Sequence, residues 1–132
     1  MTDWIRVQNS SDAHENLGPL QLAWLGDAVW EMHQRLRHCK RPGRSNDLHL
    51  AVVEEVKADS QVKALNRLEQ FLSDSEKDLV RKGRNRAKRG PRGGDAATYA
   101  KASGFETMVG WLFLNNPVRL AELLDQLEVL GS

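Results

Sequence analysis

Three acidic residues have a spacing that could support metal chemistry. Asp27 and Glu31 are four residues apart in a segment with helical periodicity, so they share one helix face. Like charges there repel each other unless a cation or a basic group lies between them. Glu106 is the only charged residue between positions 102 and 114, in a segment that is otherwise apolar nearly all round. Such oxygen ligands suit Mg²⁺, which takes one or two carboxylates and keeps several waters.

The isolation of Glu106 allows two interpretations. A carboxylate inside an apolar helix costs several kcal/mol unless it is paired, hydrogen-bonded or bound to a metal. A structural ion pair with an arginine is the interpretation that spacing alone favours. A ligand for a hard cation is the functional interpretation, and the residues themselves leave both open.

Cations are concentrated in residues 81–92. These twelve residues include seven Lys or Arg and no acid, so the rest of the chain carries −6 although the whole chain carries +1. Seven charges exceed what a solvated helix end needs to interact with its dipole, whereas a polyanion would use them all. We predict a nucleic-acid surface, with RNA and DNA not distinguished, formed by Arg81, Lys82, Arg84, Asn85, Arg86, Lys88, Arg89 and Arg92.

The elements that must position these residues are helices. Apolar periodicity and capping residues predict helices over 19–37, 45–72 with a break near 57–58, 73–86, 98–115 and 117–130. Ser73 and Glu76 have the spacing of a capping box, and the glycines and proline of 90–94 predict a break. No strand pattern competes. The expected fold is all-α, with five to seven helices.

The first helix has two different faces. One is a narrow apolar stripe, formed by Leu22, Leu25, Val29, Met32 and Leu36. The opposite side carries Asp27 together with Trp30, and Trp24 lies at its border. Since tryptophans and an acid do not make an ordinary solvated face, we predict a second packing partner or a cleft on this side.

Length, cysteine content and hydropathy restrict the class of protein. The 132 residues suit one domain, which we place at 18–132 after a polar arm at 1–17. A single cysteine, Cys39, excludes an intramolecular disulfide and favours a reducing compartment, here the cytoplasm. The longest apolar run, 108–114, is too short to span a bilayer, so we expect no membrane segment.

Several of these segments together resemble the ribonuclease III family. Residues 25–29, Leu-Gly-Asp-Ala-Val, resemble the centre of its signature, and Phe105-Glu106 resembles its second acidic element. The Mini-III branch, a compact bacterial form without a double-stranded-RNA-binding domain, is the more similar. Its pattern matches in order at 22–31, 46–49, 82–85, 98–99 and 105–114, so the resemblance covers about residues 17 to 116.

The resemblance implies a ribonuclease III-type endonuclease that acts as a homodimer. It implies cleavage of double-stranded RNA with Mg²⁺, for which Mn²⁺ can substitute, and maturation of the ends of 23S ribosomal RNA. Asp27 and Glu106 take the catalytic and metal-binding positions, with Glu31 and Ser103 as second-rank members of the site. In-line attack by water would leave a 5′-phosphate and a 3′-hydroxyl.

Two positions depart from the longer ribonuclease III pattern. Ala23 and Ser103 stand where that pattern has acids, which puts a full second metal site in question, although Mini-III shares such losses. For the homodimer interface, the candidates are Trp24, Trp30 and the apolar side of the first helix, with a place in the monomer core as the alternative.

Two other classes of function remain open. One is a non-catalytic helical module that binds ribosomal RNA, suggested by the missing acids. The other is a helical interaction protein in which Glu106 pairs with a buried arginine.

Overall fold

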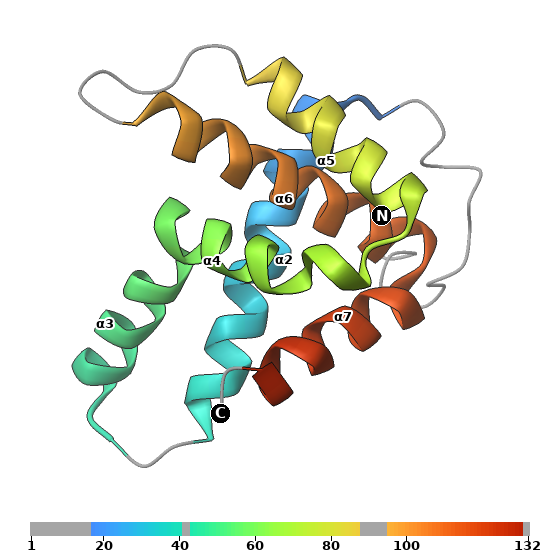
Figure 1. The fold of residues 1–132 in the computed structure, drawn as a ribbon. Helices are drawn as coiled ribbons and strands as arrows, with labels where there is room; N and C mark the ends of the chain where they lie inside the picture. Colours follow the sequence, from blue (N-terminus) through green and yellow to red (C-terminus); the bar gives the residue numbers. More distant parts are fainter. Residues whose placement is uncertain (1–16, 41–42, 88–94, 131–132) are drawn as a thin grey trace.

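The computed structural model describes residues 17–40, 43–87 and 95–130, and every statement below refers to these residues. They form six α-helices, one short 3₁₀ helix and no strand (Figure 1). In chain order the elements are α2 (Pro19–Cys39), α3 (Ser45–Val56), α4 (Ala58–Leu68), η2 (Glu69–Phe71), α5 (Asp74–Arg86), α6 (Ala96–Asn115) and α7 (Pro117–Leu130). The prediction of an all-α fold with five to seven helices is confirmed. The arm at 1–17, apart from Leu17, lies outside the described residues, so its boundary stays a prediction.

Local sequence signals set most helix ends. Lys57 has extended backbone angles, φ −64° and ψ 154°, which separate α3 from α4 at the predicted break. Ser73 and Glu76 form the predicted capping box, with Glu76 N donating to Ser73 Oγ at 3.2 Å and Ser73 N donating to Glu76 Oε1 at 2.8 Å. Asp95 caps α6 by accepting from the backbone of Ala97 at 3.0 Å. Helix α6 therefore begins two residues earlier than predicted.

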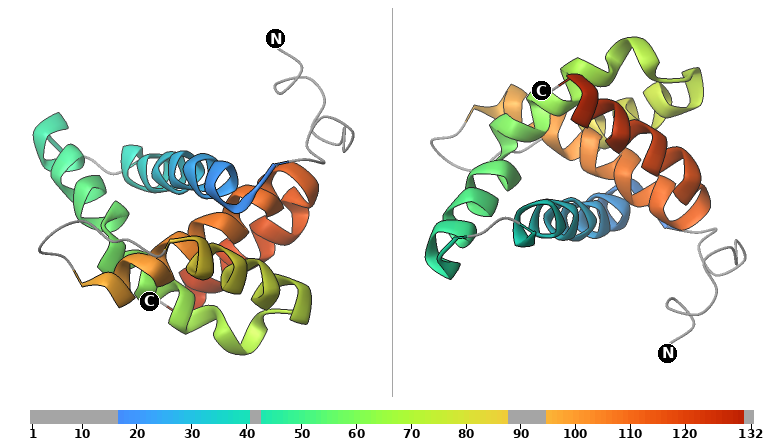
Figure 2. Two further views of the ribbon diagram at one scale, coloured as in Figure 1. Left: turned by 90° about the horizontal axis from the view of Figure 1, so that it is seen from above. Right: turned by 90° about the horizontal axis from the view of Figure 1, so that it is seen from below.

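Helix α6 runs through the middle of the bundle, with α2 and α5 against it (Figures 1 and 2). It packs most extensively on α2 and next on α5, and it also contacts α4 and α7. Its side chains at Phe105, Met108, Val109 and Leu112 are at most 1% exposed and form the centre of the core. The most apolar helix of the sequence, α6, is thus the central one, and α2, α4, α5 and α7 pack around it.

Two pairs of glycines bring the helix backbones into direct contact. A Cβ on Gly26 would lie 1.8 Å from the carbonyl oxygen of Glu106, and one on Gly110 would lie 2.1 Å from the carbonyl oxygen of Leu22. Only glycine therefore fits where α2 crosses α6. Gly83 and Gly104 play the same part where α5 crosses α6.

The buried side of α2 differs from the predicted apolar stripe. Its buried residues are Leu22, Gly26, Trp30, Gln34 and His38, whereas Met32 is 60% and Leu36 55% exposed. The contact at Gly26 is the reason, since residues four positions apart from it then face α6. The side opposite the predicted stripe, which carries Trp30, was expected to have a second packing partner or a cleft. This prediction is confirmed, because Trp30 is buried there.

Trp30 belongs to the core of the chain itself. It is 4% exposed and packs edge-on against Phe105, with ring centroids 5.1 Å apart. Its candidacy for a homodimer interface was wrong, and the alternative, monomer core, is the correct one. Trp24, at 82% exposed, remains available for an interface.

A partly buried ion pair joins α5 to α7. Arg119 Nε donates to Glu76 Oε2 at 2.7 Å, and Arg119 Nη2 donates to the carbonyl oxygen of Phe71 at 2.6 Å. Arg119, followed by the backbone of Ser73, holds the pKa of Glu76 below its usual range against the effect of burial. The same carboxylate therefore caps α5 and fixes α7.

Among the described helices, none is long and apolar enough to cross a membrane.

Candidate active site

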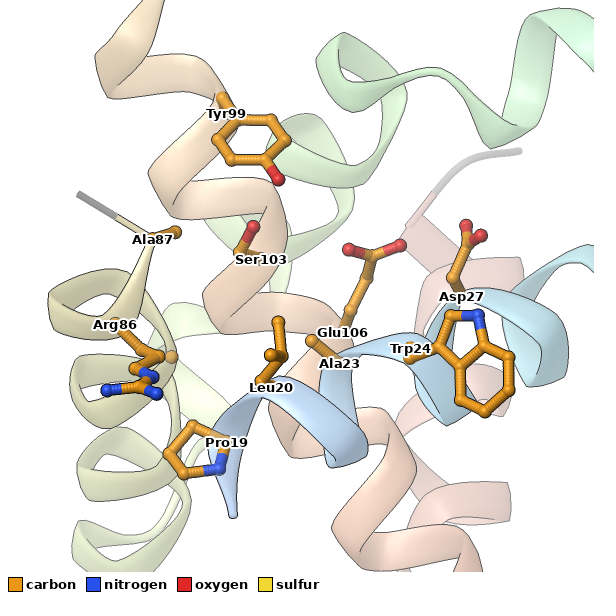
Figure 3. Close-up of a pocket in the computed structure, with 11 residues that line it drawn as sticks. Pro19, Leu20, Ala23, Trp24, Asp27, Arg86, Ala87, Tyr99, Ser103 and Glu106 are labelled. Atoms are coloured by element: carbon orange, nitrogen blue, oxygen red, sulfur yellow. The ribbon is translucent and has the colours of Figure 1, made fainter. Parts of the chain in front are cut away.

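A cavity of about 720 Å³ lies between α2, α5 and α6. It is lined by Pro19, Leu20, Ala23, Trp24, Asp27, Gly83, Arg86, Ala87, Tyr99, Ser103 and Glu106. Figure 3 shows the carboxyl groups of Asp27 and Glu106 near the crossing of α2 and α6, with Ser103 and Tyr99 further along α6. Tyr99, Ser103 and Glu106 are spaced as neighbours on one helix face, so α6 presents a row of oxygen atoms to the cavity.

Asp27 and Glu106 come together because their helices touch. Gly26 contacts the backbone of Glu106, and Asp27 is the next residue along α2, so the sequence Gly-Asp sets an exposed carboxylate beside a half-buried one. Burial and then the neighbouring Asp27 carboxylate raise the pKa of Glu106 to about 8. A site of this kind favours a proton or a cation between the two acids.

Glu106 accepts a hydrogen bond from an amide. Gln61 Nε2, on α4, donates to Glu106 Oε2 at 3.2 Å, and this contact lowers the pKa of Glu106 against the larger opposing effects. None of the ion pairs between described residues includes Glu106. The ion pair between Glu106 and an arginine, which spacing alone favoured, is thus not found in the described part of the chain.

The second-rank members of the predicted site have different positions. Ser103 is 8% exposed and lines the cavity one turn before Glu106. Glu31 is not among the lining residues and instead pairs with Arg35 at 3.3 Å. Within 17–40, 43–87 and 95–130, no three His, Cys, Asp or Glu residues are grouped as a metal site would group them. The candidate oxygen ligands are therefore Asp27 and Glu106, with Ser103 beside them.

The cations of α5 divide between two sides of the helix. Arg86 lines the main cavity, and with Lys82 and Asn85 it also lines an adjoining hollow of about 360 Å³ next to Pro19. Arg84 instead lines a separate groove of about 280 Å³ together with Lys101. Arg81 and Lys82 both pair with Asp78. Of the predicted nucleic-acid surface, Lys88, Arg89 and Arg92 lie outside the described residues.

Sequence reasoning missed Gln61 as a member of this site. A usable signal was present, because Gln61 precedes Leu65 and Leu68 by one and two helical turns and so lies on the apolar face of its helix. A polar residue on that face needs a partner inside the protein.

Comparison with known proteins confirms the family inferred from these motifs. The ribonuclease III domain model matches residues 20–117. A Mini-ribonuclease 3 of Synechocystis sp. is 41% identical over 128 residues, which cover 96% of this chain and 90% of the relative. Another, of Symbiobacterium thermophilum, is 43% identical over 112 residues, covering 83% of this chain and 86% of the relative.

A solved structure has the same fold. The crystal structure of a protein from Fusobacterium nucleatum superposes with a TM-score of 0.76, at 24% identity, over 92% of this chain and 96% of that one. The family match, the related sequences and the cavity that contains the signature aspartate agree with one another. The chain therefore belongs to the ribonuclease III family, as an endoribonuclease of the Mini-III type.

Proposed function

We propose that the chain hydrolyses double-stranded RNA with Mg²⁺ bound by Asp27 and Glu106, leaving 5′-phosphate and 3′-hydroxyl ends. The observation that carries this proposal is the meeting of the two carboxylates in a cavity whose α5 side carries Arg86. Metal-assisted phosphodiester hydrolysis needs acids that bind the metal ion and a basic side chain that attracts the phosphate, and this cavity has both.

The residues present fit a hard divalent cation. All the candidate ligands are oxygens, and two carboxylates are as many as Mg²⁺ commonly takes from a protein. Their mutual repulsion contributes to the raised pKa of Glu106, and a cation between them would relieve it. When bound, Mg²⁺ supplies an activated water and neutralises charge on the phosphoryl group.

The chain's own residues bind and orient the substrate. Lys82 and Arg86, on one side of α5, neutralise phosphates of the RNA backbone near the cavity, and Asn85 lies between them as a hydrogen-bonding group. The hydroxyls of Tyr99 and Ser103 are available to ribose or phosphate oxygens. An A-form duplex exposes 2′-hydroxyls and phosphates across its wide minor groove, so this surface recognises shape more than sequence.

We propose further that two copies form a homodimer, so that two sites cut the two strands of one duplex. Exposed apolar side chains on α2 and on α3, which packs against it, support this proposal. They include Trp24, Met32, Leu36, Leu50 and Val53. Light scattering after size exclusion should give twice the monomer mass of 14.9 kDa, and Leu36→Glu should return the monomer.

For the biological substrate, we propose the double-stranded ends of the 23S ribosomal RNA precursor, in the cytoplasm. The resemblance to the Mini-III branch supports the substrate, and the single exposed thiol of Cys39 suits a reducing compartment.

Cleavage of duplex RNA in the presence of Mg²⁺ tests the reaction. Asp27→Asn should fold and bind RNA like the wild type but lose cleavage, because the amide cannot hold the cation in place of the carboxylate. Equal cleavage by Asp27→Asn would refute the metal site. A wild-type chain that binds duplex RNA and never cleaves it would instead favour the non-catalytic RNA-binding module.

A further inference from the structure

Gln61 is a deeply buried polar residue in contact with the active site. It is 2% exposed on α4, and its Nε2 donates to Glu106 Oε2 at 3.2 Å. The two residues are 45 positions apart along the chain, so their contact depends on the packing of α4 against α6. No part of the chemistry proposed above uses this amide.

Packing alone does not require a glutamine at this position. Gln61 lies on the same face of α4 as Leu65 and Leu68, which are both buried in the core. A leucine or methionine would continue that apolar face, whereas a buried amide is unfavourable unless its polar atoms find partners. The residue type therefore matches the need of Glu106 for a donor better than the need of the core for volume.

The charge of the donor also matters for cation binding. A lysine or arginine beside Glu106 would orient its carboxylate but would also neutralise it and repel a divalent cation. An amide is a neutral donor, which restrains one carboxylate oxygen and leaves the negative charge in place. Partners of this kind orient metal ligands, and their loss commonly costs about 10–100-fold in metal affinity or activity.

We propose that Gln61 is a positioning residue that orients the Glu106 carboxylate toward the divalent cation without neutralising it. This inference rests on the proposed function, since it requires a cation at Asp27 and Glu106. It assigns to α4 a role in the site, to which α2, α5 and α6 contribute the cavity walls.

The test compares Gln61→Met with wild type and with Gln34→Met. Methionine keeps the length and volume of glutamine and removes the donor. Gln34 is the matched control, because it is 0% exposed and lies two helical turns beyond Asp27 on α2, outside the cavity lining. The readouts are Mn²⁺ affinity by calorimetry without RNA, kcat and KM for duplex RNA, and the melting temperature of the metal-free protein.

For Gln61→Met we expect Mn²⁺ affinity and kcat to fall about 10–100-fold, while KM for RNA and the metal-free melting temperature stay near wild type. Gln34→Met should bind Mn²⁺ and cleave like wild type. Gln61→Asn keeps an amide that is one methylene too short to reach, and it should show the same loss.

Wild-type Mn²⁺ affinity in either folded Gln61 variant would overturn the proposal, and so would failure of both variants to fold, because Gln61 would then be a structural residue. A wild-type chain that neither binds Mn²⁺ nor cleaves RNA would refute the proposed function itself. The two failures are thus distinguishable.

Discussion

Replacing Gly26 with alanine should disable the site without removing any of its ligands. The added Cβ would lie 1.8 Å from the carbonyl oxygen of Glu106, whereas ordinary van der Waals contact begins at about 3.4 Å. Both contacting atoms are fixed to helix backbones, so no change of side-chain rotamer relieves the clash. The two helices must separate by roughly 1.5 Å at this point, which carries Asp27 away from Glu106.

Two opposing terms decide the effect on stability. Alanine gains roughly 1 kcal/mol over glycine in helix propensity. Overpacking typically costs about 1–3 kcal/mol and can cost more where backbone has to move. Since a 1.8 Å approach requires backbone movement, we expect Gly26→Ala to be net destabilising by a few kcal/mol. A displacement of about 1 Å at a reacting centre can also cost on the order of 10²-fold in rate.

The assay combines urea denaturation with cleavage of duplex RNA and Mn²⁺ titration. Gly43→Ala is the matched control, because its Cβ would meet only the side chain of Leu48, at 3.8 Å. We expect this control to unfold and cleave like wild type. Wild-type stability and activity in Gly26→Ala would refute the argument that glycine contact between α2 and α6 assembles the site.

Three further predictions follow from other contacts. The pKa of Glu106 is raised from 4.5 to about 8 in the folded protein, so the metal-free wild type should lose stability as pH rises between these values, because the folded chain retains a proton that the unfolded chain has released. Glu106→Gln should lack that slope in urea denaturation at pH 5 to 9, and an unchanged slope would contradict the assignment. Glu76→Gln should cost about 1–3 kcal/mol at pH 7, because Arg119 would lose its buried carboxylate partner and keep only the exposed Glu122 and the carbonyl oxygen of Phe71. In wild type the stabilisation from this pair is complete above pH 4.5 and is lost as pH falls through the lowered pKa of Glu76, so equal unfolding midpoints for the two proteins at pH 7 would refute it. Arg86→Ala should weaken duplex-RNA binding and reduce the slope of log K against log salt by about 1, while Arg67→Ala on α4, outside the cavity lining, should leave the slope unchanged.

Helix boundaries were predictable because local interactions determine them. The capping box at Ser73 and the break at Lys57 depend on residues within one turn, and both are confirmed. The start of α6 was predicted two residues late, since the cap by Asp95 adds Ala96 and Ala97 before the predicted start.

The inward face of α2 was not predictable from hydropathy. Its buried side includes Gln34 and His38, while Met32 and Leu36 are exposed. The orientation is set by the contact at Gly26, and glycine has too little hydropathy to contribute to an apolar stripe. A helix can therefore have a clear apolar face and still pack through another one.

The two acids of the site could be identified from the sequence, but their surroundings could not. Glu106 was conspicuous because it is charged within an apolar segment, and Asp27 because of the motif that contains it. The meeting of Asp27 and Glu106 and the amide donor of Gln61 depend on how α2 and α4 pack on α6, which no local pattern specifies.

The glycine contacts also separate the positions around the site that can be redesigned from those that cannot. Gly26, Gly83, Gly104 and Gly110 fix the axial register of α6 between its two neighbours, so libraries should hold them constant. Leu20, Ala23, Tyr99 and Ser103 line the cavity between α2, α5 and α6, and Figure 3 shows their side chains there. Engineering of an altered cutting preference should begin at Leu20, Ala23 and Tyr99, where a new side chain changes the lining and leaves the glycine contacts intact, while Ser103 stays with the acids of the site.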